Sequence, residues 1–374
     1  MTTISFSLRV ILRTSLKKDV EQTTVPRLFR VMTLITNNGK DMMIKRTISL
    51  AALAALMLFG LAAEAQARSW RINSDATKKP HFADINAAMS SSEVVDGDTL
   101  YLDPGCLITA TQNVTKRVTI IGCGYFSNGA VKPAVLKCYV YLRAEGCKME
   151  SCDLDNGIIY FRAGHCTVER TKVAEIRWES TGQYCTVRQC YITHNIVGYG
   201  TTDTKSAYFT LENSIITQTT GDCTIQDFYL PTIRNNYLRC NNHPVYRITQ
   251  GIIENNIVMN PSNIENVGTS RSECTLRNNI ESKTGDADNL LGSADESLVF
   301  ALEGTNDQRY RLKEDSPARG AATDGGDCGP FGGMYPYVCS GYPRGMPRFE
   351  SSTVPTRPQD GQLRVTQKVV LQSE

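Results

Sequence analysis

The chain has 374 residues, with 40 Lys and Arg against 38 Asp and Glu, which gives a formal net charge of +2. Residues 1–67 hold nine of the basic and four of the acidic residues, so residues 68–374 have a net charge of −3. Because there is also no dense basic stripe, the composition argues against a nucleic-acid partner, which needs a surface that neutralises phosphates.

Residues 42–67 have the layout of a secretory signal peptide. A basic pair, Lys45-Arg46, precedes an apolar run, and Ala65-Gln66-Ala67 matches an A-x-A cleavage site. The apolar run is shorter than the roughly 20 residues of a transmembrane helix, so we expect cleavage and no transmembrane anchor in the mature chain. The sequence therefore predicts export to the periplasm, the cell surface or the extracellular space. Residues 1–41 are interpreted as an upstream extension from a misplaced start.

A short motif with one apolar anchor residue recurs through the middle of the chain. It is clearest in TIRNNYL (232–238), IIENNIV (252–258) and TLRNNI (275–280). Short β-branched runs separated by Asn, Gly, Asp and Thr are typical of strands and turns, and the leucine-rich pattern of similar length is missing. The motif therefore predicts an all-β parallel solenoid of about eight or more coils. The anchors, at intervals of 19, 19, 24, 22, 20 and 23 residues, are Met149, Val168, Val187, Leu211, Ile233, Ile253 and Leu276, with Ile120 as an earlier member.

Equivalent positions of stacked coils form rows about 4.8 Å apart. A second apolar row follows five residues after the anchors, and a row of asparagines lies between the two apolar rows. Asn tolerates the left-handed backbone that a sharp corner needs, so we interpret this row as a corner ladder with stacked side-chain amides. The second apolar row is Leu154, Val173, Ile192, Ile216, Leu238 and Val258, and the asparagine row is Asn213, Asn235, Asn255 and Asn278.

The residues directly after the anchors are charged, and their sign alternates from Glu169 onward. Opposite charges on neighbouring strands attract, so the alternation supports the proposed register. We interpret the row as a solvated ladder of weak ion pairs and prefer this to a substrate-binding row. Its members are Glu150, Glu169, Arg188, Glu212, Arg234, Glu254 and Arg277.

All thirteen cysteines lie between residues 106 and 339, and their odd number rules out complete pairing within the chain. Several share one row, two residues before the anchors: Cys147, Cys166, Cys185 and Cys274. Cysteines that repeat at core positions behave as small apolar residues, so we expect a mostly reduced ladder. Cys328 and Cys339 are the best candidates for a disulfide.

Three further segments extend the pattern: HFADINAAMSSSEVVDGDTLYLDPG (81–105), VTIIGCGY (118–125) and YRLKEDSPARGAATDGGDCGPFGGMYPYVCSGYP (310–343). Together with the coils they resemble the pectate-lyase-like superfamily of secreted bacterial β-helix proteins over about residues 80–345. The resemblance implies a right-handed parallel β-helix with a short N-terminal cap helix, whose apolar side is Phe82, Ile85 and Met89. The family includes polysaccharide lyases, glycosidases and proteins with no known catalysis, so the resemblance implies a polysaccharide partner without fixing an activity.

The spacing of the rows also predicts a candidate site. Glu175 and His194 both stand seven residues after an anchor, so we expect them to be neighbours on successive coils. A carboxylate beside an imidazole can act as an acid–base pair, which makes these two the candidate catalytic residues. Arg177 would bind an anionic sugar, and Trp178 or Tyr199 would stack on a sugar ring. The alternative, a polar row on an outer face without function, remains open.

An acidic stretch, TGDADNLLGSADES (284–297), contains Asp286, Asp288, Asp295 and Glu296. Their spacing is loosely suggestive of Ca²⁺, but the glycine and the terminal glutamate of an EF-hand loop are missing. We interpret the stretch as an acidic loop that leaves the last coil, and we expect no metal ion and no other cofactor.

We expect one β-helix domain over residues 68–350, including the cap and the glycine-rich closing loops. Residues 351–374 are predicted to be a linker followed by one edge strand that covers the open end of the solenoid. Three functions remain compatible with the sequence. The protein binds or scaffolds polysaccharide at or outside the cell envelope, it is a polysaccharide lyase or glycoside hydrolase, or it is a structural envelope or adhesion protein.

Overall fold

The computed structural model describes residues 67–126, 132–179, 182–199, 206–217, 223–241, 243–259, 271–282, 289–304, 306–343, 348–353 and 366–370. The upstream extension, and the expected signal peptide up to residue 66, lie outside these residues. Within the described part of the chain, no helix has the length and apolar character needed to cross a membrane.

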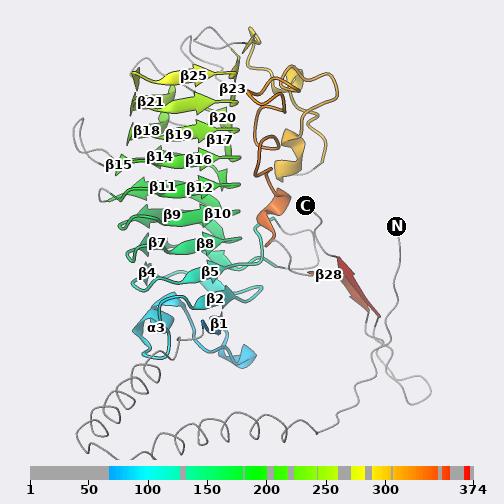
Figure 1. Ribbon diagram of the computed structural model, residues 1–374. Helices are drawn as coiled ribbons and strands as arrows, with labels where there is room; N and C mark the ends of the chain where they lie inside the picture. Colours follow the sequence, from blue (N-terminus) through cyan, green and yellow to red (C-terminus); the bar gives the residue numbers. More distant parts are fainter. Residues whose placement is uncertain are drawn as a thin grey trace, which may run out of the picture. The chain divides into compact units, whose positions relative to one another are not determined.

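The coils build a first sheet in which all strands are parallel and in register (Figure 1). Most of its strands have only three residues, of which the middle one is the buried anchor. In spatial order the strands are β1 (Ser69–Ile72), β2 (Thr99–Leu102), β5 (Thr119–Ile121), β8 (Lys148–Glu150), β10 (Thr167–Glu169), β12 (Thr186–Arg188), β16 (Thr210–Glu212), β19 (Thr232–Arg234), β22 (Ile252–Glu254) and β25 (Thr275–Arg277).

The remaining coil strands form two further parallel faces, which we name the second and third sheets. Two long strands, β9 (Asp153–Phe161) and β11 (Lys172–Trp178), run through both of them. The second sheet also contains β3 (Leu107–Ile108), β6 (Val135–Leu136), β13 (Tyr191–Ile192), β17 (Ile215–Thr217), β20 (Tyr237–Arg239), β23 (Ile257–Met259), β26 (Ile280–Glu281) and β27 (Asn289–Leu290). The third sheet also contains β4 (Gln112–Val114), β7 (Tyr139–Leu142), β14 (Ile196–Val197), β15 (Ser206–Ala207), β18 (Cys223–Tyr229), β21 (His243–Thr249) and β24 (Arg271–Ser272).

This arrangement confirms the predicted parallel β-solenoid and its register. Every anchor pairs with the next along the first sheet, from Ile120 to Leu276. The second apolar row is likewise continuous from Leu154 to Val258. Both rows point into one hydrophobic core, because side chains on one face of a strand repeat every second residue.

The asparagine corner is confirmed by the backbone. Asn213, Asn235, Asn255 and Asn278 have φ values of 50°, 54°, 59° and 50°, in the left-handed region that Asn tolerates better than most residues. The backbone N–H of each of the first three donates to the following coil, so the four residues form one column.

The expectation that the side-chain amides of this row bond to one another was wrong. The second residue of each asparagine pair makes that ladder instead: Asn236 Nδ2 donates to Asn256 Oδ1 (3.0 Å), and Asn256 Nδ2 donates to Asn279 Oδ1 (3.1 Å). All three are buried. Asn213, Asn235 and Asn255 of the left-handed row are buried as well, but their side chains bond to residues 323–332 and not to one another. Two adjacent asparagines therefore have different roles, one in the turn and one in the ladder.

The left-handed row holds the closing segment, which we define as residues 296–304 and 306–343. This segment lies beside the stacked coils, coloured yellow to orange in Figure 1, and runs back along them. It contains three short 3-10 helices, η2 (Glu296–Leu298), η3 (Asn306–Tyr310) and η4 (Cys339–Gly341). Its contacts with successive corners, from the last coil toward the first, are Ala321 O with Asn278, Thr323 with Asn255, Asp327 O with Asn235, Gly332 O with Asn213, and Tyr335 O with Gln189.

The closing segment also covers the outer side of the second sheet. There Ile215, Tyr237, Ile257 and Ile280 point away from the solenoid interior and pack with apolar residues of the segment in a second core. Phe300 lies edge-on to Tyr237, with their ring centroids 4.8 Å apart. The strands of the second sheet from β17 to β26 are therefore buried on both sides.

Asp307 is a buried carboxylate within the closing segment. It accepts hydrogen bonds from the Tyr337 hydroxyl (3.0 Å) and the Ser340 N–H (2.6 Å). Its other oxygen has no hydrogen-bond partner among the described protein atoms. Burial raises the pKa of Asp307, and the hydrogen bonds from Ser340 and Tyr337 and the nearby Arg311 oppose this only in part.

The raised pKa of Asp307 predicts a pH dependence of stability. The folded protein binds the proton of Asp307 more tightly than the unfolded chain does, so protonation stabilises the fold. This stabilisation is complete at low pH and is lost as the pH rises through the pKa of Asp307 in the folded state. As the pH rises from about 4 toward 7, we expect the wild type to lose stability relative to Asp307→Asn. Thermal melts of both proteins across this range measure the difference, and a difference that is constant with pH or changes the other way would contradict the prediction.

The N-terminal cap is confirmed as a short helix, α3 (Ile85–Ser90), preceded by the 3-10 helix η1 (Ala76–Lys78). Asp84 caps α3 by accepting a hydrogen bond from the Ala87 N–H (2.8 Å). Ile85, Ala88 and Met89 are buried, and Phe82 packs partly buried beside them, as the apolar side predicted.

The C-terminal strand pairs differently from the prediction. β29 (Thr366–Val370) lies within the predicted edge strand, but it pairs antiparallel with β28 (Arg348–Thr353) and so forms a hairpin. It does not extend the last coil, because its hydrogen bonds go to β28, which straddles the predicted domain boundary at residue 350.

The cysteine row packs as predicted for small core residues. Cys147, Cys166 and Cys185 are buried and share the core with the anchors. Burial also raises the pKa of Cys190 to about 12, which keeps that thiol protonated at neutral pH. The pair proposed for a disulfide is not bonded: the Cys328 thiol donates to Asn278 O (3.2 Å), and Cys339 Sγ accepts a hydrogen bond from Arg311 (3.6 Å).

Candidate functional site

The outer surface of the third sheet gathers aromatic and charged side chains from three successive coils. Strand register places Asn113, Tyr141, Tyr160 and Arg177 in one outward row. Tyr139 lies two residues before Tyr141 on the same side of β7. We name the set Tyr139, Tyr141, Tyr160, Arg143, Arg162 and Arg177 the tyrosine–arginine face.

Tyr160 contacts both of the other tyrosines of this face. Tyr141 and Tyr160 are stacked, with ring centroids 4.6 Å apart and an interplanar angle of 13°. Tyr139 lies edge-on to Tyr160 at 5.8 Å, and it is 45% exposed. An exposed aromatic residue has an apolar ring and a hydroxyl that can donate and accept, so Tyr139 can contact both kinds of group on a ligand.

The guanidinium groups surround these rings. Arg143 and Arg162 lie 5.2 Å and 4.9 Å from the centroid of Tyr141, within the range of a cation–π contact. Arg162 also forms an ion pair with Glu179, which fixes its position. The face therefore presents planar hydrogen-bond donors next to aromatic rings.

Arg177 is held by Glu175 on the same strand, with Nε 2.7 Å from Oε1. This hydrogen bond raises the pKa of Arg177, and the guanidinium stays charged. Burial raises the pKa of Tyr160, with Arg177 opposing, so the hydroxyl remains a neutral donor. Glu175 is nearly enclosed and its carboxylate is directed to Arg177, which leaves it a positioning role on this face.

The predicted contact between Glu175 and His194 is not formed. The strand pairing is irregular after Val173, so Ile176 pairs with Ile196, and the His194 N–H donates to Ala174 O (2.8 Å). Counting residues from the anchors is therefore wrong by one position in this coil, and the residue beside Glu175 is Asn195. His194 is exposed, and its ring contacts the Thr193 hydroxyl at 3.1 Å.

The two aromatic residues predicted to stack on a sugar have different positions. Trp178 is 4% exposed and packs in the core against Phe161, with ring centroids 4.5 Å apart, so its ring is not open to a ligand. Tyr199 is exposed, and its N–H and C=O bond to Ser206, seven residues later in the same coil. The part of that coil at residues 200–205 lies outside the described residues.

The tyrosines of the face were missed at the level of sequence. Their signal is the alternation in YVYLR (139–143) and IIYFR (158–162), where the outward positions of two successive strands carry Tyr and Arg. Alternation with period two identifies the outward side of a strand, and the predicted register would have aligned these segments.

The acidic stretch after the last coil has structural roles where it is described. Asp295 caps η2 by accepting a hydrogen bond from the Ser297 N–H (2.9 Å), and Glu296 Oε1 accepts one from the Tyr237 hydroxyl (2.5 Å). Asp286 and Asp288 lie outside the described residues. Among the residues that are described, no group of three or more His, Cys, Asp or Glu side chains is arranged to hold a metal ion.

No family model matches this chain, and comparison with curated proteins and with solved structures gives no match. The parallel β-solenoid is therefore established by the register of its own strands, and the functional argument depends on the tyrosine–arginine face.

Proposed function

We propose that this protein is exported and binds polysaccharide through the tyrosine–arginine face. The observation that carries the proposal is the grouping of six outward aromatic and guanidinium side chains from three coils on one sheet. Sugar rings have apolar C–H faces and hydroxyl edges, and these match an exposed Tyr139 ring flanked by arginine donors. The signal-peptide layout and the pectate-lyase-like resemblance both support this function.

A lyase or glycosidase activity is not part of the proposal. The catalytic hypothesis required Glu175, Arg177 and His194 to converge, and only Glu175 and Arg177 are in contact. The arrangement instead matches what we expect for binding, namely an exposed aromatic strip without an acid–base pair.

Binding to a panel of acidic and neutral glycans tests the proposal. For the wild type we expect binding to at least one glycan, with no unsaturated product and no new reducing ends. Replacing Tyr139 and Tyr160 by Ala should weaken that binding about tenfold, because each aromatic contact contributes about 0.5–1.5 kcal/mol beyond the area it buries.

The matched control is the double variant Tyr184→Ala/Tyr208→Ala, which removes two exposed, stacked tyrosines from another part of the solenoid surface. It should bind as the wild type does. Equal losses in both double variants, or no binding to any glycan by the wild type, would exclude the tyrosine–arginine face as the binding site.

A further inference from the structure

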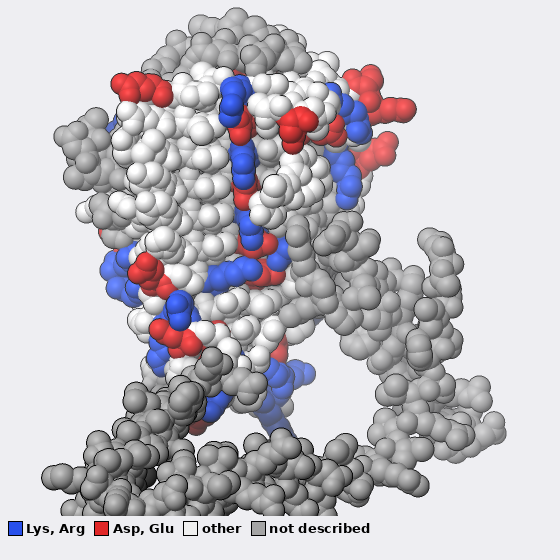
Figure 2. Space-filling view, in the orientation of Figure 1, with Lys and Arg blue, Asp and Glu red and all other residues white. Residues whose placement is uncertain are grey.

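The charged row of the first sheet places three arginines at a regular two-coil interval. Arg188, Arg234 and Arg277 are separated by Glu212 and Glu254 in continuous parallel register. With strands about 4.8 Å apart, the arginines repeat every ~9.6 Å along the solenoid axis. Figure 2 shows the alternating charges as one straight strip on the surface, and we name these three residues the arginine column.

The arginines and the glutamates of this row differ in how far their side chains are exposed. The side chains of Arg188, Arg234 and Arg277 are 26%, 40% and 51% exposed, whereas those of their partners Glu169, Glu212 and Glu254 are 5%, 5% and 12% exposed. The sequence-based description of a solvated ladder is therefore incomplete, because solvent meets the arginines and the glutamates lie beneath them. Along this strip the arginines are the more exposed charges, at two-coil intervals, and the less exposed glutamates lie between them.

Each arginine is held in position and retains free donors. Arg234 donates from Nε and Nη2 to Glu212 Oε2, at 3.0 Å and 2.7 Å, and Arg188 donates from Nη2 to Glu169 at 2.9 Å. A guanidinium has five N–H donors, so others remain available to an anion. Because the glutamates hold each guanidinium group in place before a ligand arrives, the arginine side chains lose little conformational freedom on binding.

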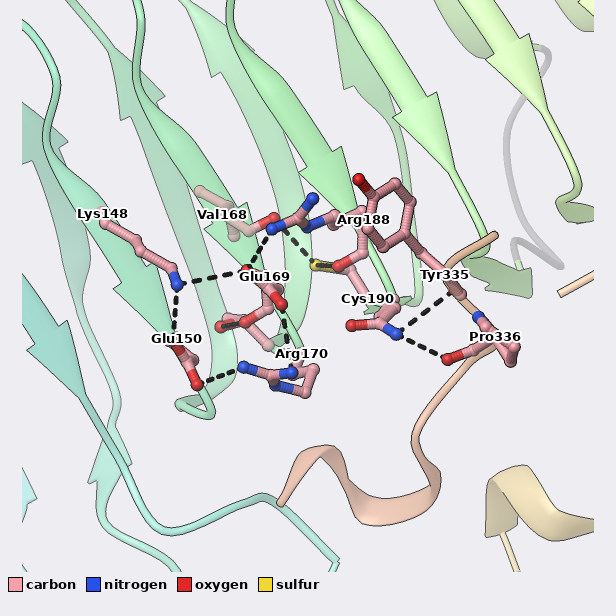
Figure 3. Close-up of polar contacts among 11 residues, drawn as sticks. Lys148, Glu150, Val168, Glu169, Arg170, Arg188, Cys190, Tyr335 and Pro336 are labelled. Carbon is pink, nitrogen blue, oxygen red and sulfur yellow. Dashed lines mark hydrogen bonds and ion pairs between the residues drawn. The ribbon is translucent and has the colours of Figure 1, made fainter. Parts of the chain in front are cut away.

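At the Arg188 end of the arginine column, positive side chains outnumber negative ones (Figure 3). Lys148 bonds to Glu150 (2.8 Å) and Glu169 (3.3 Å), and the buried Arg170 bonds to both carboxylates as well. With Arg188, three cations therefore face two acids. Tyr335 of the closing segment lies under the Arg188 guanidinium, 4.7 Å from the ring centroid, and supports its position.

We propose that the arginine column binds a linear acidic polysaccharide that carries one carboxylate or sulfate per disaccharide and lies along the solenoid axis. The length of a disaccharide in an extended glycan is similar to the two-coil interval, so successive anionic groups would reach successive arginines. A glycan with a charge on every sugar would place alternate anions over the buried glutamates. A nucleic-acid strand has a phosphate on every nucleotide, so its anions, like those of a glycan with a charge on every sugar, would not all meet arginines.

This site is on a different sheet from the tyrosine–arginine face, and the two proposals can fail separately. The test measures binding of hyaluronan, polygalacturonate, a neutral glucan and single-stranded DNA at two salt concentrations. We expect hyaluronan to bind most tightly and more weakly at the higher salt concentration. Tighter binding of polygalacturonate or DNA, or no binding of hyaluronan, would overturn the proposal.

Substitutions test whether hyaluronan binds at the arginine column. Arg234→Gln/Arg277→Gln should weaken hyaluronan binding tenfold or more. The control Arg71→Gln/Arg247→Gln removes two arginines of similar exposure and pairing on other strands, and it should change binding less than threefold. Partly exposed ion pairs contribute little to stability, so both variants are expected to fold, which circular dichroism checks. If both variants lose the same amount of hyaluronan affinity, binding depends only on the total positive charge of the protein, and the arginine column is not the site.

A purely structural ladder is distinguished by removing the glutamates. Glu212→Gln/Glu254→Gln breaks the same ion pairs but leaves the arginines. It removes two negative charges and also the bonds that pre-organise the arginines, and these two effects oppose each other, so the proposal predicts a much smaller loss of binding than in the arginine variant. Hyaluronan binding that falls as far as in the arginine variant would show that the ladder acts through the fold alone, and the proposal would be wrong.

Discussion

A chain that ends after residue 292, and so lacks the closing segment, is expected to lose its cooperative native state. Tyr237, Ile257 and Ile280 would then expose side chains that are now buried in the second core. Burial of one large apolar side chain contributes about 1.5–3 kcal/mol, so three together approach the about 5–15 kcal/mol that stabilises a whole domain. The asparagine corners would also lose the carbonyl groups that they now bond.

Thermal unfolding followed by circular dichroism, together with binding of a hydrophobic dye, measures this effect. A chain that ends at residue 343 is the control, since it keeps the whole closing segment and removes a hairpin whose strands pair with each other. It should melt at the wild-type temperature. If the shorter chain also melts cooperatively within a few degrees of the wild type, the closing segment is not a structural part of the solenoid.

Replacing Asn256 by Ala is expected to be the most damaging single substitution at the corner, with a loss of about 3–5 kcal/mol. The Asn256 side chain is fully buried and bonds Asn236 N and Nδ2 (both 3.0 Å), Ile233 O (2.9 Å) and Asn279 Oδ1 (3.1 Å). Alanine would remove the side-chain partner of Asn236 N and Ile233 O, whereas Asn236 Nδ2 keeps Leu211 O and Asn279 Oδ1 keeps the Asn256 N–H. Each buried group left without a partner costs about 1–3 kcal/mol. Chemical denaturation measures the free energy of unfolding of the variant.

Asn255→Gly provides the neighbouring comparison. Glycine adopts the left-handed backbone of this position freely, so the variant loses mainly the two bonds to Thr323, at a cost of about 1–2 kcal/mol. A larger loss at Asn255 than at Asn256 would show that the turn, and not the buried amide ladder, sets the stability of the corner.

The rows of the solenoid could be predicted because a parallel, in-register stack turns a sequence repeat directly into spatial neighbours. Ile233 and Ile253 are twenty residues apart in the chain and adjacent in the first sheet, as their matching contexts indicate. The same logic identified Asn255 as a corner residue. It could not separate the role of Asn255 from that of Asn256, because both are Asn and only the backbone conformation distinguishes them.

The candidate site was predicted less well, because it depends on segments where the repeat is irregular. One additional residue between Ile192 and Ile196, relative to Val173 and Ile176, is enough to move His194 away from Glu175. Trp178 was assigned to the outside, but it alternates with Arg177 on β11 and so points inward. The path of the closing segment could not be predicted either. Glycine-rich loops have no periodicity, and several of the bonds to the corners are accepted by the main-chain carbonyls of the segment, which any residue type provides.

The most direct test of the central claim is a crystal structure of the protein with an oligosaccharide of a glycan whose binding is weakened by replacing Tyr139 and Tyr160. The proposed function predicts sugar rings over the third sheet, in contact with Tyr139 and Tyr160 and within hydrogen-bonding distance of Arg162 or Arg177. A sugar bound elsewhere, with this face unoccupied, would contradict the assignment of the tyrosine–arginine face. A glycan panel without any bound member would contradict the proposed function itself.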